Sequence, residues 1–523
     1  MTMPPNRPSL APLDGTRHDI LIVGGGISGC SAAQHLAAAG YSVLLVEKGD
    51  FASAATGRSS RLLHCGLRYL APARSPVEFL VRPDKLWTAL SMAVRSLRTR
   101  REFLAASPDR LRVLDMAIPV YRGAAYPGWQ VDLGAAMLGA LNLGGPPLNY
   151  WRRKPDRAAA DHPLVARLRE PETLASVFGF RDYQFHWPER ISIDAAMAAE
   201  RHGAVLRNYT EATALEPLPG GGWRAVLKDS LAPGTPAAVE GRMLLNLAGV
   251  WVDEVNRKAA PTSPPSRKIV VVKGAHIAVR LPDECRGFGI AGLNTEGEHI
   301  FCLPWGDLHY IGPTETVYEG DLEDVRPDEA DIAFLLEEVN HMMPALDLKR
   351  DDVELAWAGA RPITYDPERA KGRRMPFSVL HDLGREGMGD ALAVTWAAIM
   401  FHRPTARKLV KRVRAALRPS GPPVPVSYAV EGFPENTNAP PLIADCPDIT
   451  TATLRHVAER EHPAHLTDIL FRRTGLGWRT QVPEEAARRA AESVADILGW
   501  DEARVAREVE GYLAHVRAQH LQD

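Results

Sequence analysis

Cysteine is scarce in this chain: there are five among 523 residues, with no Cys-x-x-Cys pair and no group of Cys and His at zinc-binding spacing. This scarcity argues against a structural metal and favours a reducing compartment such as the cytoplasm. An excess of either charge is also missing, because the formal net charge is only −2. We therefore expect no metal site and no nucleic acid partner.

Long apolar runs are absent as well, since no stretch reaches the roughly 18 consecutive apolar residues that a transmembrane helix needs. The nearest approach, 133–148, is interrupted by Gly and Pro, and we expect it to form a buried helix and loop. Basic stretches at 95–101 and 151–154 flank it, so peripheral contact with the inner face of the cell membrane stays open. Residues 1–18 lack the apolar core of a signal peptide, and we expect them to be a disordered leader.

The most informative segment present is 19–50, which predicts a dinucleotide-binding unit. An apolar strand leads into three glycines, an Ala-rich helix and a second apolar strand that ends at Glu47. The glycines are Gly24, Gly26 and Gly29, at G-x-G-x-x-G spacing. The first permits a tight turn, the second lets backbone approach a pyrophosphate, and the third lets the helix pack closely on the strand.

The acid at the end of the second strand narrows the choice of dinucleotide cofactor. Glu47 stands near the spacing of roughly 20 residues expected for a carboxylate that binds ribose hydroxyls. A free hydroxyl is what such an acid recognises, so a 2′-phosphorylated dinucleotide is disfavoured. The helix N-terminus adds unpaired N–H groups for the diphosphate. From this segment alone, FAD and NAD both remain open.

The length of the chain predicts two or three domains. Short strands and turns alternate over 269–312, as in a mixed sheet that covers a substrate. A Pro-rich linker at 419–429 then precedes a helical tail at 430–523. We therefore predict an α/β fold: a Rossmann-like cofactor-binding domain interleaved with a mixed-sheet substrate domain over 19–418, followed by a C-terminal helical domain.

Several longer motifs resemble those of one family. They are SSRLLHCGLRYL (59–70), NLAGVW (246–251), KGAHI (273–277), LPWGDLHYIGPTE (303–315), AGARPI (358–363) and FRRTGLGW (471–478). Together with the glycine fingerprint, they resemble the FAD-dependent glycerol-3-phosphate dehydrogenases of the D-amino-acid-oxidase-like superfamily. The resemblance implies FAD rather than NAD, and a hydride transfer from a secondary alcohol of a phosphate-bearing substrate to flavin N5. Electrons would then pass to quinone or to O₂.

The same resemblance implies roles for individual residues. It suggests Arg68 and Arg361 as anion-binding groups, because a guanidinium fork fits phosphate oxygens. Tyr69 is the expected orienting hydroxyl and His276 the leading base. The implied cofactor-binding residues are Gly24, Gly26, Gly29, Glu47, Ser59, Ser60, His64 and Gly249.

One departure from the family pattern affects function. Where the family has a GGKLTTYR-type segment, this chain has WAAIMFHR, so Ala398 replaces the active-site lysine and Trp396 and Ala397 replace the glycines. An alanine supplies neither charge nor a proton. One alternative is therefore a specialised flavin oxidase or dehydrogenase acting on another anionic alcohol or amine. A catalytically inactive FAD-fold protein is a second alternative, and the C-terminal helices could form a homodimer contact.

Overall fold

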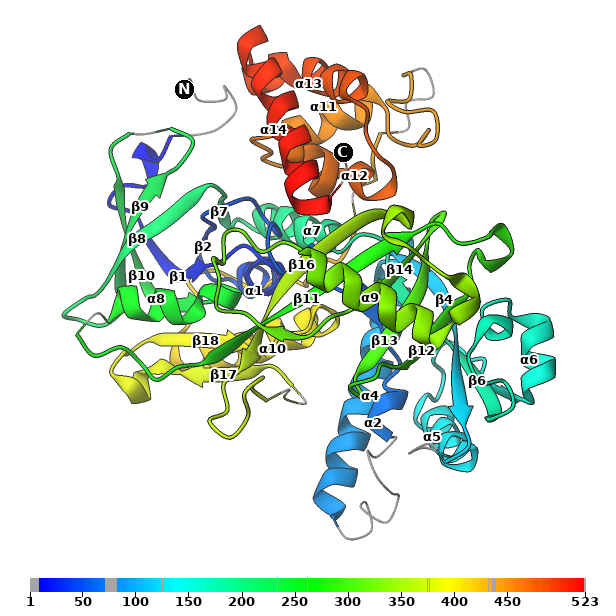
Figure 1. The fold of residues 1–523 in the computed structure, drawn as a ribbon. Coiled ribbons are helices and arrows are strands. Elements are labelled where there is room, and N and C mark those ends of the chain that lie inside the picture. Colours follow the sequence, from blue (N-terminus) through cyan, green and yellow to red (C-terminus); the bar gives the residue numbers. More distant parts are fainter. Residues whose placement is uncertain are drawn as a thin grey trace.

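Two β-sheets lie side by side in the computed structural model, and a helical bundle caps them (Figure 1). The structure describes residues 9–70, 82–123, 127–232, 234–260, 262–373, 375, 377–430, 432–434 and 439–521. None of the helices in these ranges is long and apolar enough to cross a membrane.

The first sheet has eight strands in the order β17-β18-β10-β1-β2-β7, and β9 and β8 extend it beside β10. Its centre is parallel from β18 through β10, β1 and β2 to β7. The strands are β1 (Arg17–Val23), β2 (Val43–Val46), β7 (Val205–Arg207), β8 (Thr210–Pro217), β9 (Trp223–Asp229), β10 (Ala237–Asn246), β17 (Val379–Asp382) and β18 (Ala391–Thr395).

Helices cover one face of this sheet. The apolar side chains of β1 alternate between that face and the opposite one. Ile20 and Ile22 point to a core shared with α1 (Ile27–Ala38), α7 (Pro188–Arg201) and α10 (His402–Ala416). Leu21 points to the opposite core, against β9 and β10. This period of two places both faces of β1 in apolar surroundings, as expected for a central parallel strand.

The second sheet has ten strands in the order β15-β11-β14-β13-β12-β4-β6-β3, with β16 beside β11 and β5 beside β6. Its strands are β3 (Leu62–Leu63), β4 (Leu111–Tyr121), β5 (Trp151–Arg153), β6 (Leu174–Phe185), β11 (Ile269–Val279), β12 (Gly289–Leu293), β13 (His299–Trp305), β14 (Leu308–Gly312), β15 (Thr316–Val317) and β16 (Val353–Thr364). The two sheets take their strands from alternating parts of the chain, and the predicted interleaved α/β fold is confirmed.

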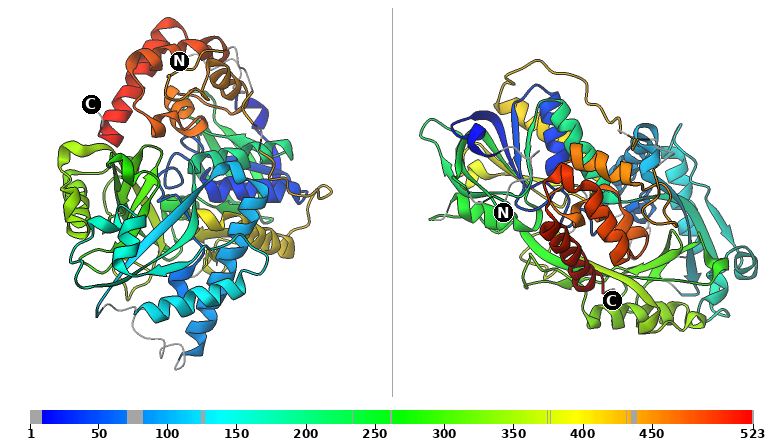
Figure 2. Two further views of the ribbon diagram at one scale, coloured as in Figure 1. Left: turned by 90° about the vertical axis from the view of Figure 1, so that its right-hand side faces the viewer. Right: turned by 90° about the horizontal axis from the view of Figure 1, so that it is seen from above.

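The remaining helices lie around this frame (Figures 1 and 2). Beside the second sheet are α2 (Leu67–Leu70), α4 (Pro83–Ala106), α5 (Gly128–Leu141), α6 (Pro155–Asp161) and α9 (Glu329–Met342), and α8 (Val252–Ala259) packs beside β8. The C-terminal bundle contains α11 (Thr451–Arg460), α12 (Leu476–Arg479), α13 (Glu484–Leu498) and α14 (Glu502–His520). The described residues between α10 and α11 form no helix or strand.

Two expectations differ from the structure. The leader was expected to be disordered to residue 18, but Leu10 is buried in the core of the first sheet, and β1 already begins at Arg17. Residues 1–8 lie outside the described residues. The helix within 133–148 is expected to be buried, but α5 buries only one face: Ala135 and Leu138 lie in the core, whereas Leu133 is 51% exposed.

Candidate active site

A cavity of about 400 Å³ is lined by residues of both sheets. It lies at the carboxyl ends of β1, β2 and β18, where Val23, Val46 and Val394 face it. The second sheet contributes residues of β13 and β16, including Phe301 and Ala360. Open α/β sheets bind their ligands at this edge.

The glycine turn shapes one end of the cavity. Gly24 has a φ of +109°, and a Cβ there would lie 2.5 Å from the carbonyl oxygen of Leu247. A Cβ at Gly29 would lie 1.8 Å from the carbonyl oxygen of Gly24, so only glycine lets α1 approach β1 this closely. Gly26 caps the N-terminus of α1 and lines the cavity together with Gly24.

Glu47 lies beside this turn at the end of β2. One of its carboxylate oxygens accepts a hydrogen bond from the Gly25 amide at 2.6 Å, and the other accepts from the Gly49 amide at 2.9 Å. Burial raises the pKa of Glu47 above its usual range. The carboxylate also lines the cavity, so its remaining lone pairs can accept from ribose hydroxyls. Gly249, with φ +60°, lines the same end, and a Cβ there would meet nothing within 4 Å.

Ser59, Ser60 and His64 also line the cavity. Ser60 Oγ lies 3.0 Å from Nε2 of His276. The His276 ring is 1% exposed, is absent from the cavity lining, and stacks on Trp357 with 4.8 Å between ring centroids. The expected base therefore reaches the cavity through Ser60 rather than directly.

The electrostatic surroundings of His276 keep it neutral. Burial lowers its pKa well below the usual value, and the positive charges of Arg361 and Arg61 lower it further. In the tautomer with the proton on Nδ1, Nε2 accepts a hydrogen bond from Ser60. His276 is thus a neutral hydrogen-bond partner of Ser60.

Arg361 is on β16 and lines the cavity. Its Nη1 lies 3.4 Å from Oε1 of Glu315, which also lines the cavity. The guanidinium lies over Gly274 of β11, where a Cβ would come within 2.1 Å of Nη2. The sequence interpretation did not single out Gly274. The KGAHI motif contained it, but its pairing with Arg361 arises only when β11 and β16 join.

The remaining expected catalytic residues are on α2. Tyr69 Oη lies 3.3 Å from Nε2 of His64, and Tyr69 is absent from the cavity lining. The side chain of Arg68 is outside the described residues. Cys65, which takes the place of a family glycine, is 1% exposed, and burial raises the pKa of its thiol well above the usual value. That thiol is therefore protonated and unreactive.

The altered segment forms an apolar wall. Trp396, Ala397, Ala398, Ile399 and Met400 all line the cavity. Trp396 has a φ of +53°, a left-handed conformation that glycine adopts without strain. The Trp396 side chain packs against a small cluster of Val270, Val272 and Ile363. Packing thus offsets the backbone strain at the position where the family has glycine.

Other cavity residues were not singled out from the sequence. Arg58 and Arg61 both line the cavity, and burial lowers the pKa of each guanidinium to about 10. Arg61 is 1% exposed and lies 4.0 Å from the ring centroid of Trp305. Glu298 and His299 of the β13 edge complete this side. The one sequence feature that points to Arg61 as a cavity residue is its place in the SSRLLHCGLRYL motif.

Comparisons with known proteins agree with this geometry. A family model described as DAO, FAD dependent oxidoreductase, matches residues 19–398. A second, described as the C-terminal domain of alpha-glycerophosphate oxidase, matches residues 434–505.

Among relatives, a glycerol-3-phosphate dehydrogenase of Synechocystis is 28% identical over 432 residues, covering 79% of this chain and 73% of that one. A D-erythritol 1-phosphate dehydrogenase of Brucella abortus is 30% identical over 406 residues, covering 76% of this chain and 73% of that one.

Among solved structures, the glycerol-3-phosphate dehydrogenase of Bacillus halodurans complexed with FAD superposes with a TM-score of 0.71 at 20% identity, covering 98% of this chain and 96% of that one. The glycine turn, the open ends of β1 and β2 and the Glu47 carboxylate fit the dinucleotide part of FAD. The expected cofactor and enzyme class are confirmed. The chain is an FAD-dependent oxidoreductase of the DAO family, resembling glycerol-3-phosphate dehydrogenases.

Proposed function

We propose that this enzyme oxidises the secondary alcohol of a small phosphate-bearing substrate, with glycerol 3-phosphate as the first candidate. Bound FAD supplies the hydride acceptor at flavin N5. The observation that carries the proposal is the Arg361 guanidinium in the wall of the cavity, fitted over Gly274. A planar guanidinium binds phosphate oxygens through paired N–H donors.

The orientation of Arg361 supports the proposal. Glu315 contacts one end of the Arg361 guanidinium at 3.4 Å. The close contact with Gly274 sets the distance between the guanidinium and β11. A substrate phosphate would bind the fork with little reorganisation of this side chain, so binding energy is available to orient the carbinol carbon. Arg68 is proposed as a second anion contact on the strength of the family motif alone.

Proton removal from the alcohol is assigned to the Ser60–His276 pair. The substrate hydroxyl gives its proton to Ser60 Oγ, while the Ser60 proton moves to Nε2 of His276. Tyr69 contacts His64, so we propose that it orients the substrate indirectly, through that ring.

The family lysine is replaced by Ala398. This replacement supports a substrate whose reacting end carries a different chemical group. Ala398 is exposed to the cavity beside apolar neighbours, so an uncharged extension of the substrate is better accommodated there than a second anion. The alternative function, oxidation of another anionic alcohol or an amine, rests on this wall. The Brucella relative is named for a longer polyol phosphate, which makes such a phosphate the second candidate.

The electron acceptor is proposed to be quinone or O₂, with contact to a membrane through α4 and α5. These helices and the turn after α5 carry Trp87, Trp129, Leu133 and Leu143, each more than half exposed. α4 also carries exposed basic side chains: Lys85, Arg95, Arg98 and Arg101. Apolar side chains with nearby cations suit an anionic lipid surface, here proposed as the inner face of the cell membrane. A homodimer stays a prediction.

Anaerobic reduction of the flavin tests the proposed substrate class. The purified holoenzyme is mixed without oxygen with glycerol 3-phosphate, D-erythritol 1-phosphate, unphosphorylated glycerol and a primary amine that carries a phosphate. We expect a phosphorylated polyol to bleach the flavin absorbance and glycerol to leave it oxidised. Bleaching by the amine alone would instead select the alternative function.

A further inference from the structure

The FRRTGLGW motif has no role in the proposed reaction, although it is one of the most distinctive stretches of the sequence. It lies in the C-terminal bundle, where its residues form the end of the π-helical turn η10 (Asp468–Arg473) and most of α12. None of its residues lines the cavity. Three of its side chains nevertheless contact segments that do: Arg472 and Arg473 contact one segment, and Trp478 contacts another.

The first contact is with Asp50, three residues after Glu47. Arg473 donates from Nη2 to Oδ1 of Asp50 at 2.8 Å and from Nη1 to Oδ2, and Arg472 donates from Nε to Oδ2 at 2.5 Å. Asp50 and Arg473 are 1% and 0% exposed, respectively. Burial by itself would raise the pKa of Asp50, but the two arginines hold it well below its usual value. The contact is therefore a buried, fully charged network.

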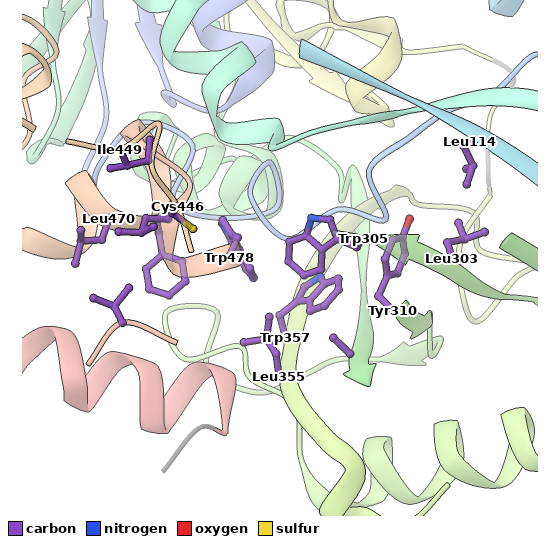
Figure 3. Packing of buried hydrophobic residues seen from close by; sticks show 14 of the residues in the cluster. Leu114, Leu303, Trp305, Tyr310, Leu355, Trp357, Cys446, Ile449, Leu470 and Trp478 are labelled. Atoms are coloured by element: carbon purple, nitrogen blue, oxygen red, sulfur yellow. The ribbon is translucent and has the colours of Figure 1, made fainter. Parts of the chain in front are cut away.

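The second contact is with Arg61, which follows Ser60. The Arg61 guanidinium lies beside two indoles that also contact each other, 4.7 Å from the ring centroid of Trp478 and 4.0 Å from that of Trp305. Trp478 is held in turn by Nε1, which donates to Glu189 at 2.7 Å. Figure 3 shows Trp478 of the C-terminal bundle beside Trp305 and Trp357 of the second sheet. Such stacking of a buried guanidinium is a favourable cation–π arrangement.

Both contacted segments line the cavity and hold a strained residue. Asp50 is flanked by Lys48 and Ala52, which line the cavity, and Arg61 itself lines it. Ala52 and Arg61 have φ values of +62° and +61°, although neither is glycine. Backbone of this kind persists only where the surrounding structure holds it. Each of the two segments has a residue that contacts the C-terminal bundle: Asp50 contacts Arg473, and Arg61 contacts Trp478.

We propose that the segment Arg472–Trp478 is a positioning element for FAD: it holds the cavity-lining segments around Asp50 and Arg61 in their FAD-binding conformation. The C-terminal bundle thereby governs how long the holoenzyme keeps its cofactor. The proposal depends on the FAD dependence of the chain and not on the proposed substrate, so the two can fail separately.

The test measures how fast FAD leaves the diluted holoenzyme, followed by the rise in flavin fluorescence without any substrate. Arg473→Gln removes the bidentate charged contact to Asp50, and we expect FAD release about tenfold faster than from the wild type. The matched control is Glu508→Gln. Glu508 accepts from His465 and from the Leu466 amide inside the bundle, so its loss weakens the bundle without touching either cavity-lining segment.

Two further variants keep the test decisive should Arg473→Gln not fold. Asp50→Asn preserves the size of the side chain that Arg473 contacts and removes its negative charge. This variant should also speed FAD release. Trp478→Phe removes the hydrogen bond to Glu189 and part of the ring surface that packs on Arg61, and it should also speed FAD release. Thermal unfolding of every variant separates these effects from general destabilisation. The proposal is overturned if the folded variants release FAD no faster than Glu508→Gln does.

Discussion

Ser60 Oγ and His276 Nε2 lie 3.0 Å apart, with the serine in the cavity lining and the histidine buried behind it. This pair connects the segment that follows the cofactor-binding unit to β11 of the second sheet. In the proposed reaction, the substrate proton leaves the cavity through this pair.

Removing either member of this pair should slow the chemical step. We expect Ser60→Ala and His276→Gln each to lower kcat by about 10²-fold, the usual contribution of one proton-transfer group. Because the two act in series, the double variant should be little worse than either single variant. Steady-state kinetics with the best phosphorylated polyol measures this. Independent, multiplying effects of the two substitutions would contradict a relay.

Gly274→Ala should weaken binding of the anion while leaving the cofactor in place. The new Cβ would lie 2.1 Å from Nη2 of Arg361, so the guanidinium must move from its position over β11. Loss of one charge-assisted contact corresponds to about 1.5–3 kcal/mol, or a KM increase of roughly ten- to hundredfold. Gly139→Ala is the control, because a Cβ there meets nothing within 4 Å. An unchanged KM for Gly274→Ala would exclude Arg361 as the anion contact.

Ala398→Lys should alter which substrate is preferred. The side chain at Ala398 faces the cavity, so a lysine there would add positive charge beside Ile399 and Met400. We expect turnover of glycerol 3-phosphate to rise relative to longer polyol phosphates. Ala398→Met adds similar length without charge and should not have this effect. Equal behaviour of the two variants would indicate that volume, rather than the missing charge, sets specificity.

Buried neutral histidines predict a loss of stability in mild acid. Burial lowers the pKa of His35 to about 4, and it lowers those of His276 and His402 well below 6.5. In the unfolded chain the same groups titrate near 6.5. Between that value and about pH 4 the unfolded state binds more protons, so stability falls as pH falls through this window. Denaturant midpoints measured at pH 7.5 and 5 should therefore differ. Equal midpoints would show that these rings are not held neutral.

The surface of α5 gives a separate prediction about membranes. Replacing Leu133 and Leu143 by Ser should reduce co-sedimentation with vesicles that contain anionic lipid, since both side chains are more than half exposed. Val424→Ser is the control, because Val424 is 49% exposed in the extended segment that follows α10. Wild-type protein that stays in the supernatant at low salt would contradict membrane contact.

The sequence predicted best what depends on local spacing. Gly24, Gly26, Gly29 and Glu47 act within one strand–helix–strand unit, so their arrangement follows from their order along the chain. The interleaved sheets followed from motif order and from the family resemblance.

Contacts made between distant segments were not predictable in the same way. That Ser60 screens His276 from the cavity depends on how β11 packs beside the 58–64 segment. Likewise, Gly274 acquires its importance from Arg361 on the neighbouring strand. The exposure of Leu133 could not be predicted because an apolar helix looks alike whether it is buried or projects from the fold.

The most direct test of the central claim is anaerobic single-turnover reduction of the flavin by a phosphorylated polyol that carries deuterium at its secondary carbinol carbon. The account predicts that the flavin bleaches, that deuterium slows the bleaching, and that the polyol without phosphate fails to bleach it at the same concentration. Bleaching that is unaffected by deuterium, or a flavin that stays oxidised with every phosphorylated alcohol, would contradict oxidation of a secondary alcohol at this site.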